Sequence, residues 1–402
     1  MQSKSRREFI KSSLLASSLL FVPNFLQAIN HPDRLARIAD ANGRRLVVVQ
    51  LGGGNDGLNT VVPYQNDIYY RARPGIALPS TKLLSLEKDL AFNPVMEGLK
   101  KLFDEGQVGI FNSVGYPNPD RSHFRSMDIW HTGSDATEYL STGWLGRYLD
   151  SNCAACATSF NGIEVDDTLS LAMKGRSKKG LALENAKKLY QTASDPLYQH
   201  LPQPGSTNSE LDYLYKTVIE TTASADYLYQ KAKIYQSKTS YPDSRFSRNL
   251  KTAAELICSG ADTRVFYVSL PGFDTHANQV GQQGRLLGEL SEGLYAFVQD
   301  LKSKNEFNNT LILVFSEFGR RVKQNASNGT DHGTANNLFL LGGGLKRAGI
   351  LNEAPDLATL DEGDLRHQLD FRSVYATILD NWLASDADAI LGKKFNRLTG
   401  LV

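Results

Sequence analysis

Cysteine is scarce in this sequence, with three residues among 402, which is too few for a fold held together by disulfide bonds. An excess of charge of one sign is also absent, because 44 lysines and arginines face 43 aspartates and glutamates. This balance gives no general electrostatic reason to expect nucleic acid or an anionic membrane as the main partner. Hydrophobic residues nevertheless make up 41% of the chain, a proportion typical of a folded globular protein.

The first 28 residues have the pattern of an export signal. A charged start that contains Arg6-Arg7 precedes an apolar run over 14–26, and the small residue Ala28 follows. The paired arginines resemble a twin-arginine signal. A single membrane anchor is the alternative, but the run is shorter than the ~20 apolar residues that a spanning helix needs, and no later stretch is apolar enough. We therefore expect residues 1–28 to direct export through the twin-arginine translocase, and residues 29–402 to form one periplasmic or secreted domain with no stable membrane span.

Two of the cysteines, Cys153 and Cys156, stand close together in the sequence Asn-Cys-Ala-Ala-Cys-Ala. In an oxidising compartment they could form a disulfide. A thioredoxin-like motif would need a strand followed by a helix around the pair, and a zinc site would need a second pair of ligands. We favour a structural or incidental pair, and its redox state stays open. Cys258 has apolar neighbours and is interpreted as a buried thiol.

Five runs rich in β-branched and apolar residues indicate the strands of a largely buried sheet. They are Arg45–Leu51, Gln107–Ser113, Thr263–Leu270, Thr310–Ser316 and Asn337–Leu341. Helical patterns over 94–105, 281–305 and 371–384 alternate with these runs, which predicts an α/β domain with a doubly wound sheet. From about residue 181 to 257 the sequence is polar, helical in period and rich in tyrosine, which indicates a helical insertion or cap on the sheet.

Polar side chains cluster where the predicted strands end, and ligands of such sheets bind at that edge. These side chains are Asp56 after the first run, Ser122 at a helix start after the second, Asp274 and His276 after the third, Glu317 and Arg320 after the fourth, and His332 just before the fifth. A lone aspartate after a strand is usually a helix cap, so the joint placement is the signal. Imidazole and carboxylate together favour zinc or manganese, whereas oxygen ligands alone favour calcium or magnesium. The sequence thus predicts a divalent metal ion without distinguishing zinc, manganese or calcium.

Ser122 is the candidate nucleophile because it would lie at a helix N-terminus, where backbone N–H groups stabilise an oxyanion or a phosphate. The alternative that it only caps the helix carries equal weight. His123 and His131 could be ligands or bases, or could only pack, and packing is favoured for His131. The glycine-rich stretch at 52–57 does not fit the spacing of a dinucleotide-binding loop.

Several long motifs in the chain resemble the DUF1501 family of exported bacterial proteins. They are LVVVQLGGGNDGLNTVVPY, RSHFRSMDIWHTG, GWLGRYLD, GFDTHANQ, LILVFSEFGRR, GTDHGTANNLFLLGGG and LDFRSVYATILDNWL. The resemblance covers most of the chain and is weakest between about 160 and 255. That family looks like a branch of the alkaline phosphatase/sulfatase superfamily, so the resemblance implies a three-layer, alkaline phosphatase-like domain.

The same resemblance implies roles for single residues. Asp56 matches the position of the first metal-binding aspartate of the superfamily, and Ser122 matches its nucleophile. Asp274 with His276 resembles a pair of metal ligands, and His332 resembles the last histidine ligand. Glu317 can replace an aspartate ligand, but Phe318 follows it where the superfamily has a histidine. Either one metal remains, or Asp331 substitutes, or metal binding has been lost.

Taken together, these features predict an exported metal-dependent hydrolase of phosphate or sulfate esters, acting on a small-molecule or polysaccharide ester. Asp56, Asp274, His276, Glu317 and His332 would bind the metal. Ser122 would attack or orient water, and Arg320 would neutralise charge in the transition state. The Cys-x-Pro-x-Arg pattern of ordinary sulfatases is absent from the sequence. The alternatives are a non-catalytic periplasmic binding or scaffold protein that retains the fold, and a structural partner in the export of cell-surface polymers.

Overall fold

A computed structural model describes residues 43–152, 161–195 and 209–402 of the chain. The predicted signal over residues 1–28 and the pair Cys153 and Cys156 lie outside the described residues. None of the described helices combines the length and the apolar character that crossing a membrane requires.

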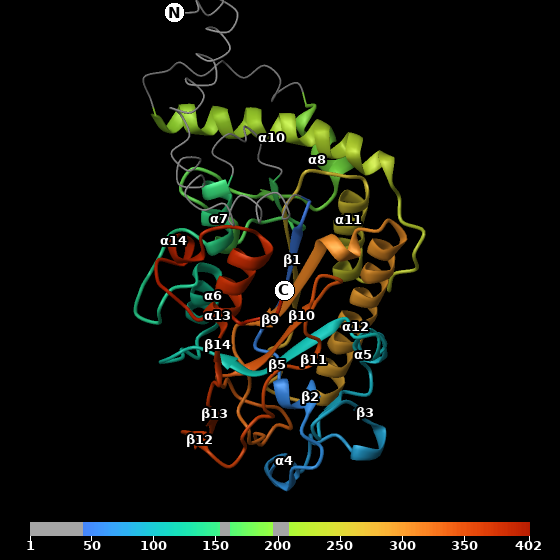
Figure 1. The fold of residues 1–402 in the computed structure, drawn as a ribbon, viewed down its shortest axis with the longest axis vertical. Coiled ribbons are helices and arrows are strands. Elements are labelled where there is room, and N and C mark those ends of the chain that lie inside the picture. Colours follow the sequence, from blue (N-terminus) through green and yellow to red (C-terminus); the bar gives the residue numbers. More distant parts are fainter. Residues whose placement is uncertain (1–42, 153–160, 196–208) are drawn as a thin grey trace, which may run out of the picture.

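A central sheet of nine strands runs through the described part of the chain (Figure 1). Its spatial order is β11-β5-β10-β9-β1-β8-β6-β7, and β14 pairs with β5 outside this path. The strands are β1 (Arg45–Gly52), β5 (Val108–Gly115), β6 (Gly162–Glu164), β7 (Leu181–Ala182), β8 (Val265–Pro271), β9 (Thr310–Ser316), β10 (Asn336–Leu341), β11 (Gly349–Ile350) and β14 (Leu369–Asp370).

The strand directions decide which chain segments meet at one edge of the sheet. β1 lies between β8 and β9 and is parallel to both, with Val48 opposite Tyr267 and Leu313. β10 is antiparallel to β9 and also to β5, so β5 runs in the same direction as β9. The carboxyl ends of β1, β5, β8 and β9 therefore lie at the same edge, and β10 begins there.

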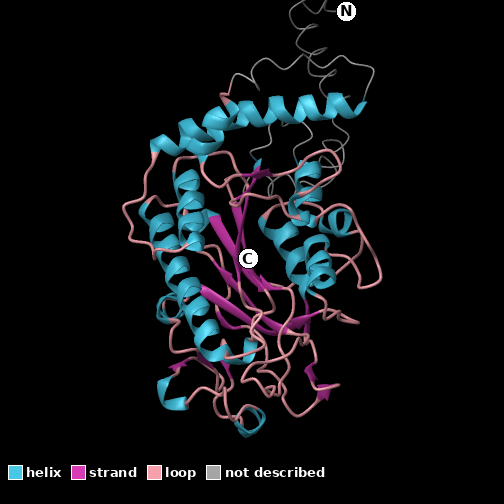
Figure 2. Ribbon diagram, turned by 180° about the vertical axis from the view of Figure 1, so that it is seen from behind, coloured by secondary structure: helices cyan, strands magenta, loops and turns pink. Residues whose placement is uncertain are grey.

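Helices cover both faces of this sheet (Figure 2). One layer contains α5 (Glu97–Asp104), α11 (Arg245–Cys258) and α12 (Gln279–Ser303), and the other contains α6 (His123–Thr132), α7 (Trp144–Asn152), α13 (Phe371–Thr377) and α14 (Ala387–Leu391). Alternate residues of β1 enter opposite cores, Val47 and Val49 on the α12 side and Leu46 and Val48 on the α6 side. Both faces of the strand are buried, which explains why its sequence is continuously apolar.

The predicted doubly wound α/β fold with three layers is confirmed. Each of the five predicted runs forms a strand, with ends that differ from the prediction by at most two residues. The antiparallel direction of β10 was not predicted, because strand patterns carry no information about direction. The short strands β6, β7, β11 and β14 were not identified either, since two or three residues give no measurable period.

The segment from 181 to 257 contributes β7 to the sheet and continues into α8 (Ala186–Ala193), α10 (Ser209–Ile234) and α11. α11 belongs to the helix layer beside α12. α10 instead crosses the end of the sheet where β1 and β8 begin (Figure 1). There the Tyr227 hydroxyl accepts a hydrogen bond from the Asp262 N–H at 3.1 Å. The predicted insertion thus divides into α11, which lies in the helix layer, and α10, which lies across the end of the sheet and joins the same core through the buried Leu228.

The remaining elements are short and lie mostly around the loops at the carboxyl edge. They are η1 (Gly57–Asn59), β2 (Val61–Val62), α4 (Asp67–Ala72), η2 (Ser80–Lys82), β3 (Leu84–Ser85), β4 (Ala91–Phe92), η4 (Leu171–Met173), η5 (Phe307–Asn309), β12 (Leu360–Asp361), β13 (Asp364–Leu365) and the π-helix η6 (Ile378–Trp382). A separate small core of apolar side chains, among them Leu58, Tyr69 and Val322, supports these loops.

Glu164, at the end of β6, is a buried carboxyl group that makes stability depend on pH. It is 4% exposed, and burial raises its pKa from 4.5 to about 7 even though the Ser170 N–H donates to Oε2. The folded state then binds the proton more tightly than the unfolded state. The contribution to stability is full below about pH 4.5 and is lost as the pH rises through about 7. In urea unfolding, the free energy of unfolding should be lower at pH 8 than at pH 5 by up to about 3 kcal/mol. The variant Glu164→Gln should not show this difference. An equal loss in the variant would contradict this expectation.

Candidate metal centre

A turn of two glycines after β1 lets the chain segments at the carboxyl edge approach one another. Gly53 has a φ of +112°, and a Cβ there would lie 2.5 Å from the backbone nitrogen of Asp274. Gly54 has a φ of +70°, and a Cβ there would lie 2.2 Å from the Phe318 ring. A side chain at either position would push apart the turns that follow β8 and β9. The glycine run is therefore required by close packing at the site.

One carboxylate oxygen, Oδ1 of Asp274, is the centre of this region. It lies 3.0 Å from Nε2 of His276, 3.2 Å from Nε2 of His332 and 3.5 Å from Nε2 of His123. Nη2 of Arg320 also lies 2.7 Å from the same oxygen. Burial raises the pKa of Asp274, but the hydrogen bond and charge of Arg320 outweigh it and hold this pKa at about 2. Asp274 is therefore a carboxylate at any physiological pH.

His123, the first residue of α6, is oriented by Glu317. Its Nδ1 lies 3.0 Å from Oε1 of Glu317, and this hydrogen bond raises the pKa of His123 against the opposing effect of burial. Glu317 is 1% exposed and is itself fixed by the Gly53 N–H at 2.8 Å and the Ser316 hydroxyl at 3.1 Å. Because the carboxylate accepts from Nδ1, Nε2 of the neutral ring carries a lone pair. That buried Nε2 has no hydrogen-bond partner.

His332 is oriented in the same way by a backbone carbonyl. Its Nδ1 donates to the carbonyl oxygen of Arg121 at 2.8 Å, so Nε2 carries the lone pair when the ring is neutral. That Nε2 lies 3.0 Å from Nε2 of His276. Burial lowers the pKa of His332 against the opposing effects of the Arg121 carbonyl and the Asp274 carboxylate, and this lowering favours the neutral ring. Metal-binding histidines are typically held by such a bond from the other ring nitrogen.

These contacts fit a divalent cation. The ligand atoms of His123, Asp274 and His332 all lie within 4.8 Å of one another, and the described residues contain no second group of this kind. Two fixed tautomers direct nitrogen lone pairs at the same space, and one of these nitrogens is buried without a partner. A cation would satisfy these atoms together. Imidazole nitrogens with one carboxylate form a donor set that zinc prefers over calcium.

Asp56 lies beside this centre but is bound within the chain. Its Oδ2 accepts from Nη1 of Arg73 and from Nε2 of Gln279, each at 2.5 Å, and its Oδ1 accepts from the Leu58 N–H at 3.1 Å. The side chains of Asp56 and Arg73 are both completely buried. The structure therefore does not place Asp56 among the ligand atoms. Its contacts hold η1 and α4 against the sheet.

Glu317 and Arg320, which were also predicted for the site, lie at the centre and hold other residues of it in place. Glu317 orients His123, and its oxygens accept from the His123 ring, the Gly53 N–H and the Ser316 hydroxyl. Arg320 is 2% exposed and donates to Asp274 and to the carbonyl oxygens of Gly53, Gly54, Phe273 and Thr330. All of its nitrogens are engaged, which makes it a positioning residue for Asp274 and the surrounding turns.

Ser122 and Phe318 complete the surroundings of the centre. Ser122 is the exposed N-cap of α6, and its side chain accepts no capping hydrogen bond. It stands between Arg121, whose carbonyl binds His332, and His123. The Phe318 ring is buried, with its centroid 4.9 Å from those of both His123 and His332. An apolar wall thus occupies the position where the resemblance implies a histidine ligand.

The two histidines that the sequence left open have opposite surroundings. His123 belongs to the centre, and the signal for it was its position next to Ser122 at a helix start after a strand. His131 lies two turns further along α6, 7% exposed, with Nε2 2.9 Å from Oε1 of Gln50. Burial lowers the pKa of His131 to about 4, so it stays neutral in the core. Its role is packing, as the sequence favoured.

Comparisons with known proteins agree with the sequence resemblance. The model of a family described as "Protein of unknown function (DUF1501)" matches residues 112–402. A search of curated proteins found no match.

Solved structures similar to this chain include a sulfatase, a periplasmic domain and a protein in the alkaline phosphatase superfamily. The PsFucS1 sulfatase from Pseudoalteromonas sp. is 12% identical, with 91% of this chain and 74% of that chain covered and a TM-score of 0.41. The C-terminal periplasmic domain of EcEptC from Escherichia coli, in complex with Zn, is 11% identical over 74% and 72%, with a TM-score of 0.37. A protein in the alkaline phosphatase superfamily from Vibrio parahaemolyticus is 13% identical over 88% and 71%, with a TM-score of 0.35. At these TM-scores the similarity carries no argument about chemistry, which rests on the geometry above.

Proposed function

Since this chain belongs to the DUF1501 family, we propose that it is an exported, zinc-dependent hydrolase of phosphate or sulfate esters. The observation that carries the proposal is the convergence of His123, His276 and His332 on Oδ1 of Asp274. The hydrogen bonds to Glu317 and to the Arg121 carbonyl fix the tautomers that a cation needs. Export is supported by the arginine pair and apolar run of the first 28 residues.

The residues around the centre suit an anionic, tetrahedral substrate group. A bound zinc ion would supply a Lewis acid that polarises an ester oxygen and lowers the pKa of a nucleophile. Asp274 stays ionised because Arg320 holds its pKa at about 2. The N-terminus of α6, where Ser122 and His123 lie, adds backbone N–H groups that favour a phosphate or sulfate oxygen. Ser122 is exposed beside the centre, where it can attack or orient water.

The proposal predicts that zinc and turnover are lost together. Protein stripped by a chelator and then reloaded should retain about one zinc per chain, as expected for a single closed group of ligands. Zinc-loaded protein should turn over at least one of p-nitrophenyl phosphate, bis(p-nitrophenyl) phosphate and p-nitrophenyl sulfate. Stripping should lower that rate by a factor of about 100 or more. Retention of no metal together with no turnover of any of these esters would reject the proposal.

A second candidate is an exported zinc-binding scaffold without turnover. It is favoured by the engagement of a predicted catalytic group and a predicted metal ligand in contacts within the chain. Arg320 is fully bound to Asp274 and backbone carbonyls, and Asp56 is bound to Arg73. The same measurements of zinc retention and ester turnover separate the two candidates, since a scaffold would bind zinc with no ester turnover.

A further inference from the structure

A cavity of about 640 Å³ opens directly beside the proposed zinc centre. Two of the residues that line it, Phe318 and Arg121, also contact the histidines of that centre. The Phe318 ring, which packs on His123 and His332, forms part of its wall. Arg121, whose carbonyl oxygen binds His332, also lines it. An ester whose charged group reaches Asp274 and the histidines would therefore place its organic part in this cavity.

A hairpin fixes the far wall of the cavity. Strands β12 and β13 are joined by Glu362 and Gly363, which have φ values of +49° and +89° and form a tight turn. Asp364, at the start of β13, is fully buried and forms an ion pair with the guanidinium of Arg121. The hairpin is thereby tied to the segment just before Ser122. The cavity is a built feature whose two walls are held together by a partly buried ion pair.

The groups that line the cavity are polar and of both charges. Asp361 and Glu362 supply carboxylates, which only accept hydrogen bonds, and Arg366 supplies a guanidinium, which only donates. Arg366 is exposed and forms no ion pair with the described residues. Asn118 adds an amide and His367 an imidazole.

This mixture of carboxylates and guanidinium favours some classes of ligand over others. A second anionic group would satisfy Arg366 but would meet the carboxylates of Asp361 and Glu362, of which only Glu362 is paired among the described residues, with Arg121 at 3.7 Å. An apolar group would cover these charged side chains without offering them a hydrogen-bond partner. A hydroxyl group both donates and accepts, so several hydroxyls on one ring can satisfy carboxylates and guanidinium together.

We propose that this cavity binds the polyhydroxylated organic part of the ester, a sugar or a cyclic polyol. The proposal rests on the proposed function for the position of the charged group, but binding in the cavity needs no turnover. The hairpin wall would select the substrate through Glu362 and Arg366, whereas the zinc centre would recognise the ester group.

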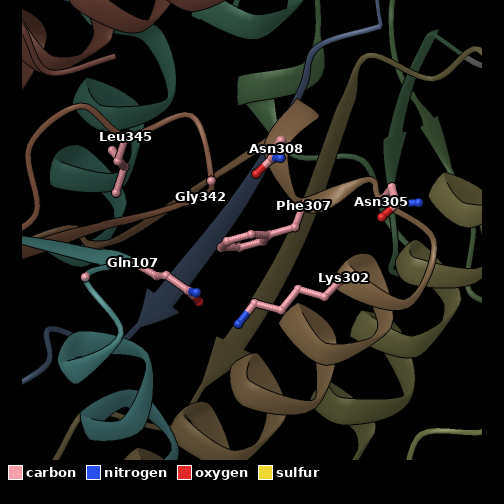
Figure 3. A pocket seen from close by; sticks show the side chains of 9 residues that line it. Gln107, Lys302, Asn305, Phe307, Asn308, Gly342 and Leu345 are labelled. Carbon is pink, nitrogen blue, oxygen red and sulfur yellow. The ribbon is translucent and has the colours of Figure 1, made fainter.

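A second cavity provides the matched control. It has a volume of about 380 Å³ and lies at the opposite edge of the sheet, where β5 and β9 begin (Figure 3). Gln107, Lys302 and Asn305 line it, so it is also polar, but Nζ of Lys302 is paired with Glu105 at 2.7 Å. No metal-binding group of the described residues adjoins it. A substitution there tests whether any polar surface cavity would give the same result.

Saturation-transfer NMR on the zinc-loaded full chain tests the proposal. The probes are D-glucose, D-galactose and myo-inositol, with succinate as an anionic probe and phenol as an apolar one. We expect transfer to at least one of the polyols, and more than to succinate or phenol. The double variant Glu362→Gln/Arg366→Ala should weaken polyol binding about tenfold, the effect of losing charged hydrogen-bond partners. Lys302→Ala should leave it unchanged. Retained zinc in each variant verifies that the centre is intact.

Three outcomes would overturn the proposal: no transfer to any polyol, undiminished transfer in the double variant, or stronger transfer to succinate or phenol. The proposed function fails separately. If polyol transfer depends on Glu362 and Arg366 but the zinc-loaded protein hydrolyses no ester, the hydrolase proposal falls and the polyol site stands.

Discussion

Replacing His123 with alanine is expected to weaken zinc binding by a factor of about 100 or more and to abolish zinc-dependent turnover. The variant removes Nε2, a ligand atom 3.5 Å from Oδ1 of Asp274. It also leaves Oε1 of the buried Glu317 without the imidazole to which it is bonded. Competition with a chromogenic zinc chelator measures the affinity, and ester hydrolysis measures the turnover.

The next residue on the same helix supplies the control. Phe124 is 87% exposed, and Phe124→Ala changes the start of α6 without removing a ligand atom. We expect this variant to bind zinc as the natural sequence does. If His123→Ala also retained full zinc affinity, His123 would be a packing residue and the centre as described would be wrong.

Asp56→Asn is expected to destabilise the fold by about 3–5 kcal/mol while the zinc content of the folded protein stays the same. The substitution leaves the guanidinium of Arg73, which is fully buried, without its only anionic partner among the described residues. Arg73 also donates to the carbonyl oxygens of Val322 and Arg321, so the loops around η1 and α4 should loosen with it. Denaturant unfolding measures the stability, and metal analysis of the folded fraction measures the zinc content.

The exposed ion pair between Lys100 and Asp104 on α5 provides the comparison. Asp104→Asn makes the same carboxylate-to-amide change at the surface and should cost less than about 1 kcal/mol. A loss of zinc in Asp56→Asn, at unchanged stability, would show that Asp56 is a ligand after all and that its pairing with Arg73 is not its main role.

The fold followed from the sequence because its signals are local and strong. The run 45–51 is apolar on both faces, and it forms β1 between two helix layers. The meeting of residues at one edge also followed, since parallel strands bring their carboxyl ends together. Asp274, His276 and His332 were placed there from strand positions alone, and the structure brings their side chains within 3.2 Å of one another.

What the sequence could not supply is how each carboxylate is used. Asp56 and Asp274 both follow a strand. Asp56 is bound by Arg73, the C-cap residue of α4, which lies 17 residues away. Asp274 instead faces three histidines. Glu317 looked like a ligand because it follows β9, but its side chain turns to Gly53 and His123. These choices depend on side chains from distant segments, and no spacing within one segment encodes them.

The central claim is that one cation is held by His123, Asp274 and His332, with His276 beside them. Anomalous diffraction from zinc-loaded crystals, collected on both sides of the zinc absorption edge, locates the ion directly. The account predicts a single strong peak at about 2.0–2.2 Å from Oδ1 of Asp274 and from Nε2 of His332 and His123. Peaks at the protein surface only, or a cation held by Asp56 away from these histidines, would contradict it.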